Sequence, residues 1–108
     1  MQGVPVLRVA AIHDLSGFGR ASLTVAIPIL ATMGIQVCPL PTAVLSSQTS
    51  GVDDFTFLDL TAQMGPIMDH WARMGLMFDA VYSGFLGSPD QSWLAGRCIR
   101  EFRAPGGI

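Results

Sequence analysis

Polar residues that could bind a small ligand occur in three segments, residues 13–19, 46–54 and 83–88. The first segment holds Asp14 and Ser16 together with glycines, and the second is a run of hydroxyl and amide side chains. Hydroxyl and amide groups orient a neutral polar ligand by hydrogen bonding rather than by transferring protons. We therefore expect these segments to bind a small molecule.

Glycines in the first segment indicate that the backbone approaches a ligand closely. Gly17 and Gly19 precede a predicted helix, whose first amide groups could bind a polar group. A dinucleotide fingerprint needs a further glycine at position 22, where this sequence has Ser22, so an NAD-binding Rossmann protein is a weak alternative. A tight strand-to-helix turn would explain the same glycines, with Ser16 or Asp14 capping the helix.

Several kinds of catalytic group are missing. The 6 basic residues are all arginines, and this excludes a P-loop lysine, a Schiff-base lysine and a lysine general base. Cys38 and Cys98 lie far apart without a metal-ligand pattern, so we interpret them as reduced thiols, a disulfide being the alternative. We interpret His13 as a hydrogen-bonded turn residue rather than a ligand contact, and His70 as boundary packing.

One acidic pair, Asp53 and Asp54, could chelate Mg²⁺, but such pairs in loops are usually solvated or cap a helix. Phe55 and Phe57 beside the pair could cover a flat ligand or pack within the loop. A metal site needs three or four converging ligands, which this pattern does not supply. We therefore predict no metal site in this chain.

The hydrophobic pattern predicts alternating strands and helices. Apolar β-branched runs predict buried strands, and apolar residues spaced by three and four predict helices. Pro28 and the pair Gly65–Pro66 should kink or split the helices that contain them. We predict an α/β domain with a mainly parallel sheet flanked by helices, whose ligands bind at the carboxyl ends of the strands. The predicted strands are residues 6–12, 35–40, 42–45 and 79–83, and the predicted helices are residues 20–33, 58–75 and 90–103.

Composition narrows the class of protein further. The chain has 108 residues, 50% of them hydrophobic and 13% charged, with a net charge of −2. This length suits a single domain, and this charge provides no surface for nucleic acid or an anionic membrane. Prolines interrupt the apolar stretches before they reach the ~20 residues that a membrane span requires. The N-terminus does not have the pattern of a secretory signal, so we expect an intracellular protein.

Three segments, in the same order, resemble bacterial pyridoxal/pyridoxamine kinases of the ribokinase-like fold. They are residues 11–28, which begin with AIHDLSGFGR, and residues 34–46 and 82–88. The resemblance extends from about Arg8 to Phe102. It implies phosphorylation by ATP of the 5′-hydroxyl of a vitamin B6 vitamer, which is pyridoxal, pyridoxine or pyridoxamine.

The resemblance also implies roles for residues at matching positions. Asp14 takes the place of a polar residue that contacts the pyridine substrate, Thr49 and Ser50 lie at the substrate site, and Phe85 packs near the ring. Gln48 stands where relatives commonly have histidine before the threonine. The backbone near the substrate is that of Ser16, Gly17 and Gly19.

In the family, the Mg²⁺–ATP contacts and the catalytic aspartate lie in a later part of the kinase, to which no segment here corresponds. We therefore expect residues 1–108 to be one partial domain that supplies the substrate-binding half, contains no catalytic residue and is inactive alone. Part of a sheet should expose a strand edge and an apolar patch, and hence self-associate. The resemblance further implies a cytoplasmic location and allows a homodimer.

Two other functions remain open. A hydroxymethylpyrimidine kinase of the same fold would act on another ring that carries a hydroxymethyl group. A non-catalytic fragment could bind the vitamer without phosphorylating it. The sequence does not distinguish among the three vitamers.

Overall fold

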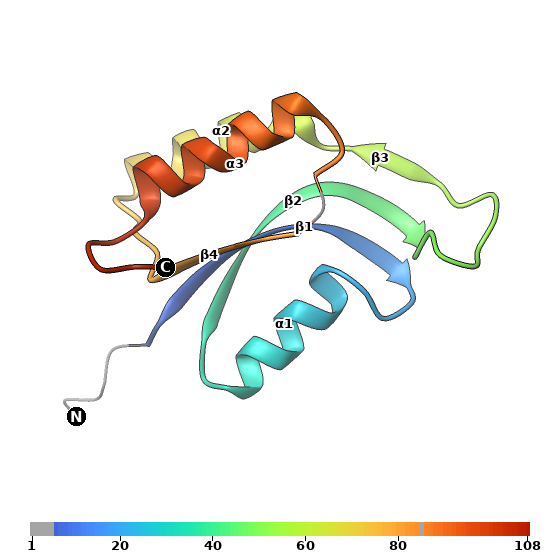
Figure 1. Cartoon of the computed structure of the whole chain (residues 1–108), viewed down its shortest axis with the longest axis horizontal. Helices are drawn as coiled ribbons and strands as arrows, with labels where there is room; N and C mark the ends of the chain where they lie inside the picture. Colours follow the sequence, from blue (N-terminus) through green and yellow to red (C-terminus); the bar gives the residue numbers. More distant parts are fainter. Residues whose placement is uncertain (1–5, 85) are drawn as a thin grey trace.

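The structure, a computed structural model, describes residues 6–84 and 86–108 as a four-stranded sheet with helices on both faces (Figure 1). The strand order is β3-β2-β1-β4, in which β1 pairs in parallel with β2 and β4, and β3 pairs antiparallel with β2. This confirms the predicted α/β class with a mainly parallel sheet. The elements are β1 (Arg8–Phe18), α1 (Leu23–Thr32), β2 (Gln36–Ser47), β3 (Phe57–Asp59), α2 (Thr61–Arg73), β4 (Ala80–Ser83) and α3 (Pro89–Phe102).

The two central strands are longer than the sequence predicts. The predicted turn at residues 13–19 is wrong over most of its length, because β1 continues to Phe18 beside β2, with a register shift between His13 and Leu15. The two strands predicted on either side of Pro41 form the single strand β2. Proline lacks the N–H that a ladder needs, but β3 pairs only with residues 43–45 of β2, so Pro39 and Pro41 need no bond on that side.

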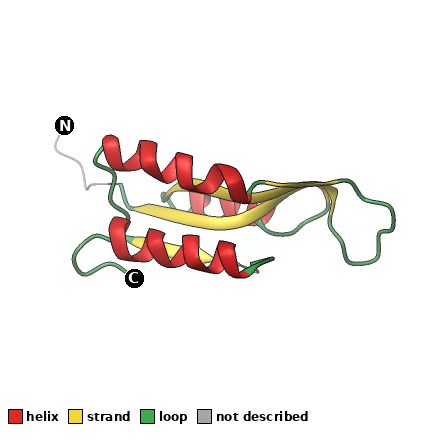
Figure 2. Ribbon diagram, turned by 90° about the horizontal axis from the view of Figure 1, so that it is seen from above, coloured by secondary structure: helices red, strands yellow, loops and turns green. Residues whose placement is uncertain are grey.

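The helices bury the sheet unequally. α1 lies against β1 and β2 on one face, and α2 and α3 pack side by side on the other (Figure 2). Met64 and Met68 of α2 and Cys98 and Phe102 of α3 are almost fully buried against the sheet. Burial of one such side chain contributes about 1.5–3 kcal/mol, so this face carries the main core. Both cysteines are free thiols, and burial raises the pKa of Cys98 to about 11.

Prolines do not break the helices as predicted. Pro66 lies inside α2, which runs without interruption, and its side chain faces solvent, where water can solvate the carbonyl that loses its partner. Pro28 likewise lies inside α1. The segment predicted as one helix over residues 58–75 begins instead with β3, because pairing with β2 is a long-range contact that local spacing does not show.

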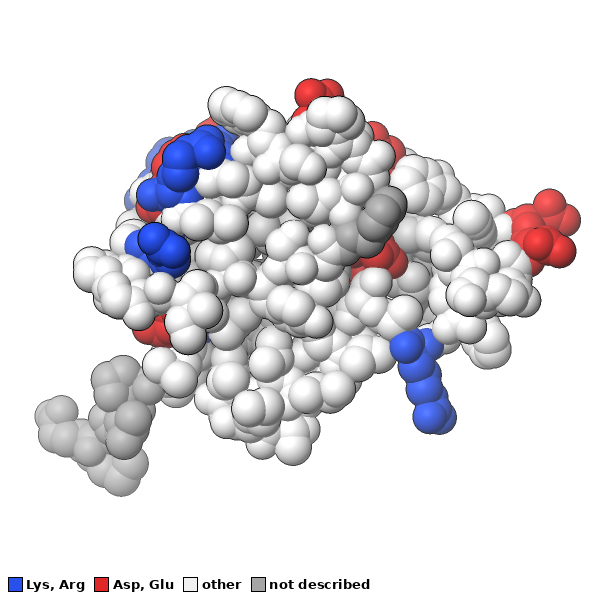
Figure 3. Space-filling view, viewed as in Figure 1, with Lys and Arg blue, Asp and Glu red and all other residues white. Residues whose placement is uncertain are grey.

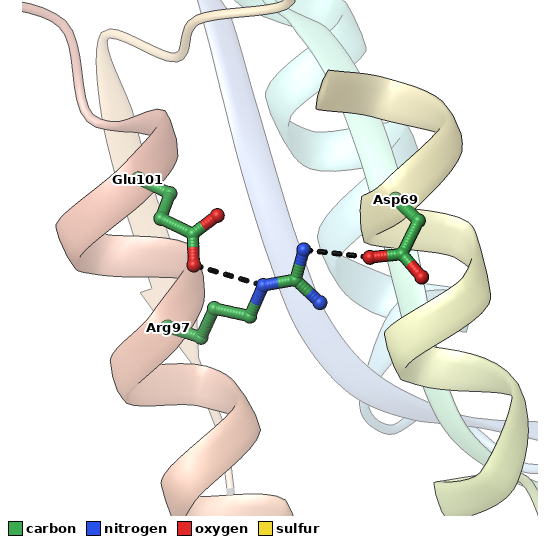
Figure 4. A network of polar contacts seen from close by, with 3 residues as sticks. All are labelled: Asp69, Arg97 and Glu101. Atoms are coloured by element: carbon green, nitrogen blue, oxygen red, sulfur yellow. Dashed lines mark hydrogen bonds and ion pairs between the residues drawn. The ribbon is translucent and has the colours of Figure 1, made fainter. Parts of the chain in front are cut away.

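An ion-pair network joins α2 and α3. The Arg97 guanidinium donates to Asp69 on α2 at 2.7 Å and to Glu101 on its own helix at 2.9 Å (Figure 4). Both carboxylates are about half exposed, and exposed pairs of this kind contribute about 0.2–1 kcal/mol. The network therefore adds little to the stability of the helix pair. Among the described helices, none has the length and hydropathy that crossing a membrane requires.

The sequence predicts an exposed strand edge and an apolar patch, and the edges of the sheet show this exposure only in part. On the outer side of β4, Ile108 donates its N–H to the Asp79 carbonyl and accepts from the Val81 N–H, so part of this edge is paired. Tyr82 of β4 and Phe57 of β3 are 52% and 62% exposed at opposite edges of the sheet. Apolar side chains are thus exposed at both edges, and self-association remains a prediction.

Candidate functional site

A pocket of about 640 Å³ lies where the carboxyl ends of β1 and β2 meet the start of α1 and the segment that leads into α3. The segments predicted to converge do so here, because parallel strands bring the residues that follow them to the same edge. The lining residues come from all three predicted segments and from β3. Among the polar lining residues are Asp14, Ser16, Ser22, Thr49, Ser50 and Asp59.

Two hydrogen bonds hold the side chain of Asp14 in the pocket. It belongs to β1 rather than to a turn, and its carboxylate accepts from the Ser22 hydroxyl at 2.6 Å and from the Ser16 hydroxyl at 3.0 Å. Ser16 is buried, and the Thr24 hydroxyl donates to its carbonyl at 2.8 Å. The carboxylate is therefore fixed in place and keeps acceptor capacity for a ligand that carries a hydrogen-bond donor.

The two predicted glycines allow close backbone approach within the chain. A Cβ on Gly17 would lie 2.9 Å from the Ser46 carbonyl oxygen, and one on Gly19 would lie 2.6 Å from Oε1 of Gln48. Gly19 also has a φ of 127°, which other residues rarely adopt. Neither glycine is among the residues that line the pocket. Gly17 allows β1 to lie close to Ser46 of β2, and Gly19 allows the chain after β1 to lie close to Gln48, which follows β2.

Thr49 and Ser50 form an exposed wall of the pocket beside Gln48. Gln48 donates its backbone N–H to the Phe18 carbonyl at 2.7 Å, which ties this wall to the end of β1. Phe85, the predicted ring contact, lies outside the described residues. Gly87 and Ser88, which follow it, line the pocket.

Several pocket residues were missed by the sequence analysis. Thr42, Asp59, Thr61 and Gln91 all line the cavity, and the side chain of Gln91 links the other three. Gln91 is only 4% exposed and shares one face of α3 with buried residues three to four positions apart. That spacing, a glutamine on the apolar face of a predicted helix, was the available signal.

His13 faces a different part of the molecule. Its side chain is 7% exposed, and the ring packs edge-on against Tyr82 with centroids 4.6 Å apart. Burial lowers the pKa of His13, and the nearby Asp14 charge only partly opposes this. Within residues 6–84 and 86–108, Nε2 is buried and has no hydrogen-bond partner. His13 lies inside β1, so the interpretation of His13 as a turn residue is wrong.

Negative charge dominates the pocket. Its described lining includes the carboxylates of Asp14 and Asp59 but no arginine or histidine. Charged side chains are also sparse over the middle of the face shown in Figure 3. A cavity of this kind favours neutral or cationic ligands, because an anion would lose its hydration without gaining a positive partner.

Metal ligands are not clustered among the described residues. Across this part of the chain there is no cluster of three or more histidine, cysteine or acidic residues that could hold a metal ion. Asp53 and Asp54 are exposed and lie outside the residues that line the pocket.

Solved structures show what the chain is similar to. A Bacteroides thetaiotaomicron protein, provisionally described as a phosphomethylpyrimidine kinase, matches with 52% identity and a TM-score of 0.93 over 100% of this chain and 37% of its own. A second crystal form of a protein with that description, with pyridoxal, matches with 53% identity and a TM-score of 0.91 over 96% of this chain and 36% of its own. Pyridoxal kinase from Lactobacillus plantarum matches with 31% identity and a TM-score of 0.85 over 91% of this chain and 35% of its own.

These matches assign the chain in two steps. The sheet, its order and its helices are those of a ribokinase-like α/β kinase. Within that class, the chain is similar to pyridoxal kinases and to proteins described as phosphomethylpyrimidine kinases, and it corresponds to an N-terminal portion of such a kinase, as the sequence resemblance predicted. It spans little more than a third of the length of the proteins it matches. No protein-family model and no curated protein matches the chain.

Proposed function

We propose that this chain is the substrate-binding part of a kinase that transfers phosphate from ATP to the 5′-hydroxyl of pyridoxal, pyridoxine or pyridoxamine. The observation that carries the proposal is the convergence of Asp14 with Thr49 and Ser50 on one cavity at the carboxyl end of the sheet. Support also comes from the relative at 53% identity, whose crystal form contains pyridoxal.

The chemistry of these side chains suits a small aromatic alcohol. The fixed Asp14 carboxylate can accept a hydrogen bond from a ring N–H or a phenolic hydroxyl. The hydroxyls of Thr49 and Ser50 can donate to or accept from the polar substituents of the ring. Phe85 remains the proposed residue that packs near the ring, and the backbone of Ser16, Gly17 and Gly19 is the proposed support beneath it.

A phosphomethylpyrimidine kinase is the second candidate, because one relative carries that description. The substrate of such an enzyme carries a phosphate group, which needs cationic or amide partners. Asp14 and Asp59 instead give the pocket a negative charge, which repels a phosphate group. This difference favours an unphosphorylated ring alcohol, either a vitamin B6 vitamer or unphosphorylated hydroxymethylpyrimidine.

The remaining parts of the reaction belong to the proposal as well. We place the ATP and Mg²⁺ contacts and the catalytic aspartate on residues outside this chain, since phosphoryl transfer depends on metal and charge positioning that the described residues do not supply. Residues 1–108 then form one partial domain, catalytically inactive by itself and located in the cytoplasm. A homodimer is compatible with this assignment. The alternative to a kinase part is a fragment that binds the vitamer without taking part in catalysis.

Calorimetric titration of the chain tests the proposal. Pyridoxal, pyridoxine and pyridoxamine should bind, and phosphomethylpyrimidine should bind at least about tenfold more weakly because two carboxylates oppose its phosphate. Asp14→Asn should weaken vitamer binding, whereas Asp53→Asn, an equal charge change at an exposed site outside the pocket, should not. Tighter binding of phosphomethylpyrimidine than of any vitamer would favour the second candidate, and no vitamer binding at all would refute the proposal.

A further inference from the structure

Gln91 connects three segments that form the ligand pocket. Its Nε2 donates to the Thr42 carbonyl of β2 at 3.2 Å and to the Thr61 hydroxyl at the start of α2 at 3.0 Å. Its Oε1 accepts from the Gly87 N–H, in the segment that leads into α3, at 2.8 Å. Thr42, Thr61 and Gly87 each line the cavity, so one buried amide fixes the distances among its walls.

The same amide also orients a carboxylate of the pocket. Oδ1 of Asp59 accepts from Nε2 of Gln91 at 3.3 Å, and from the Thr61 N–H and hydroxyl at 3.2 and 2.7 Å. Three donors from two residues therefore hold this oxygen. The rotation of the carboxylate is set by these contacts, and with it the direction of the second oxygen, Oδ2.

The position of Gln91 on α3 is itself fixed. Its backbone N–H donates to the Ser88 hydroxyl at 3.2 Å, which caps the helix, and its side chain is 4% exposed. A helix cap alone would need only the contacts with Ser88 and Gly87. The additional bonds to β2 and to the β3–α2 junction reach 30 or more residues back along the chain and add nothing to the cap.

We propose that Gln91 is a positioning residue for substrate binding, which holds Asp59 and the Gly87 segment at the separation that the ligand requires. This inference rests on the proposed function and adds to it a residue that acts without bonding to the ligand. Both polar groups of the side chain are occupied by protein partners, so its effect on affinity passes through Asp59, Thr61 and Gly87.

Gln91→Glu tests the proposal with little change in shape. The carboxylate keeps an acceptor for Gly87 but presents an oxygen, instead of a donor, to the Thr42 carbonyl and to Asp59. Vitamer affinity should fall about tenfold or more at pH 7.5, the scale expected when buried acceptors lose their donor. At pH 5, where a buried carboxyl regains its proton and one donor, the ratio to wild type should return to within about threefold.

Two further variants separate positioning from stability. Gln63→Glu makes the same substitution at an exposed site of α2 and should leave affinity unchanged. Thr61→Val removes one partner of the amide and should weaken binding by an intermediate factor, about threefold, while the fold persists. Circular dichroism of each variant fixes a temperature at which all are folded, and affinities are compared there.

The outcomes distinguish this inference from the proposed function. If wild type binds no vitamer, the proposed function fails. If wild type binds but both Gln91→Glu and Thr61→Val bind within twofold of it, only the positioning role fails. An equal loss of affinity for Gln91→Glu at pH 7.5 and pH 5 would also overturn the positioning role. A positioning role predicts that affinity recovers when the carboxyl is protonated, and a purely structural defect does not. Should Gln91→Glu not fold, Thr61→Val alone decides.

Discussion

The Ser22 hydroxyl lies 2.6 Å from Oδ1 of Asp14, eight positions earlier in the chain, and reaches it through an unusual backbone conformation. Ser22 has a φ of 55° with a ψ of −132°, outside the regions that residues with a side chain usually occupy. Such conformations cost of order 1–3 kcal/mol and persist only where the surroundings enforce them. The strained conformation of Ser22 accompanies its hydrogen bond to Asp14, and it explains why α1 starts at Leu23.

Two substitutions at Ser22 should separate the hydroxyl from the backbone. Ser22→Ala and Ser22→Gly both remove the hydrogen bond to Asp14, so both should weaken vitamer binding by about three- to tenfold. Ser22→Gly also relieves the backbone strain, so it should be more stable than Ser22→Ala by about 1 kcal/mol. Calorimetric titration and urea unfolding measure the two effects. Equal stabilities for the two variants would show that the backbone at Ser22 is not strained.

Gly19 and Gly65 should respond in opposite ways to alanine. Gly19→Ala places a Cβ against Gln48 at a φ of 127°, so it should destabilise the chain by about 1–3 kcal/mol and disturb the Thr49 wall. Gly65 lies inside α2 with no atom within 4 Å of an added Cβ, so Gly65→Ala should stabilise by about 0.5–1 kcal/mol. Urea midpoints measure both changes, and destabilisation by Gly65→Ala would contradict the open space described there.

The sequence predicted the fold class well because strand and helix periodicities are local properties. Apolar runs that alternate with helical spacing indicated the parallel sheet, whereas the glycines were interpreted as a ligand approach or a turn and did not reveal that Gly17 lies against β2. The end of β1 could not be predicted, since Leu15 to Phe18 are extended only through pairing with Val44 to Ser47 of β2. A strand that depends on a partner about thirty residues away leaves no periodic signal over four residues.

The site was predictable in part for a similar reason. Asp14, Thr49 and Ser50 follow apolar runs, and topology brings such positions to one edge. Gln91 and Asp59 act through each other and through Thr61, and this network exists only after β3 and α3 pack against β2. Spacing can indicate that Gln91 is buried, but the partners of its side chain are determined by how distant segments pack.

The absence of lysine predicts that pyridoxal binds without forming a covalent imine on a side chain. Aldehydes form stable imines with lysine amines, and the 6 basic residues here are all arginines. Reduction with borohydride in the presence of pyridoxal should therefore add no pyridoxyl group except at the terminal amine. Mass spectrometry of the digested chain measures this, with a lysine-containing protein as the positive control. A pyridoxyl adduct at any internal position would contradict the prediction.

His13 should make stability fall as the pH drops below its ordinary pKa. Burial holds the pKa of His13 in the folded chain below 6.5, its ordinary value in the unfolded chain. Between these two pKa values, His13 takes up a proton in the unfolded chain but not in the folded chain. Stability present above pH 6.5 should then decline at up to about 1.4 kcal/mol per pH unit as the pH falls.

His13→Phe keeps an aromatic ring against Tyr82 and cannot titrate, so its unfolding free energy should change less over this range. His70→Asn, at an exposed position of α2, should retain the wild-type slope. Urea unfolding from pH 5 to 7.5 measures the free energy of unfolding of the wild type and of both variants. If the pH dependence is kept in His13→Phe but lost in His70→Asn, the prediction is contradicted.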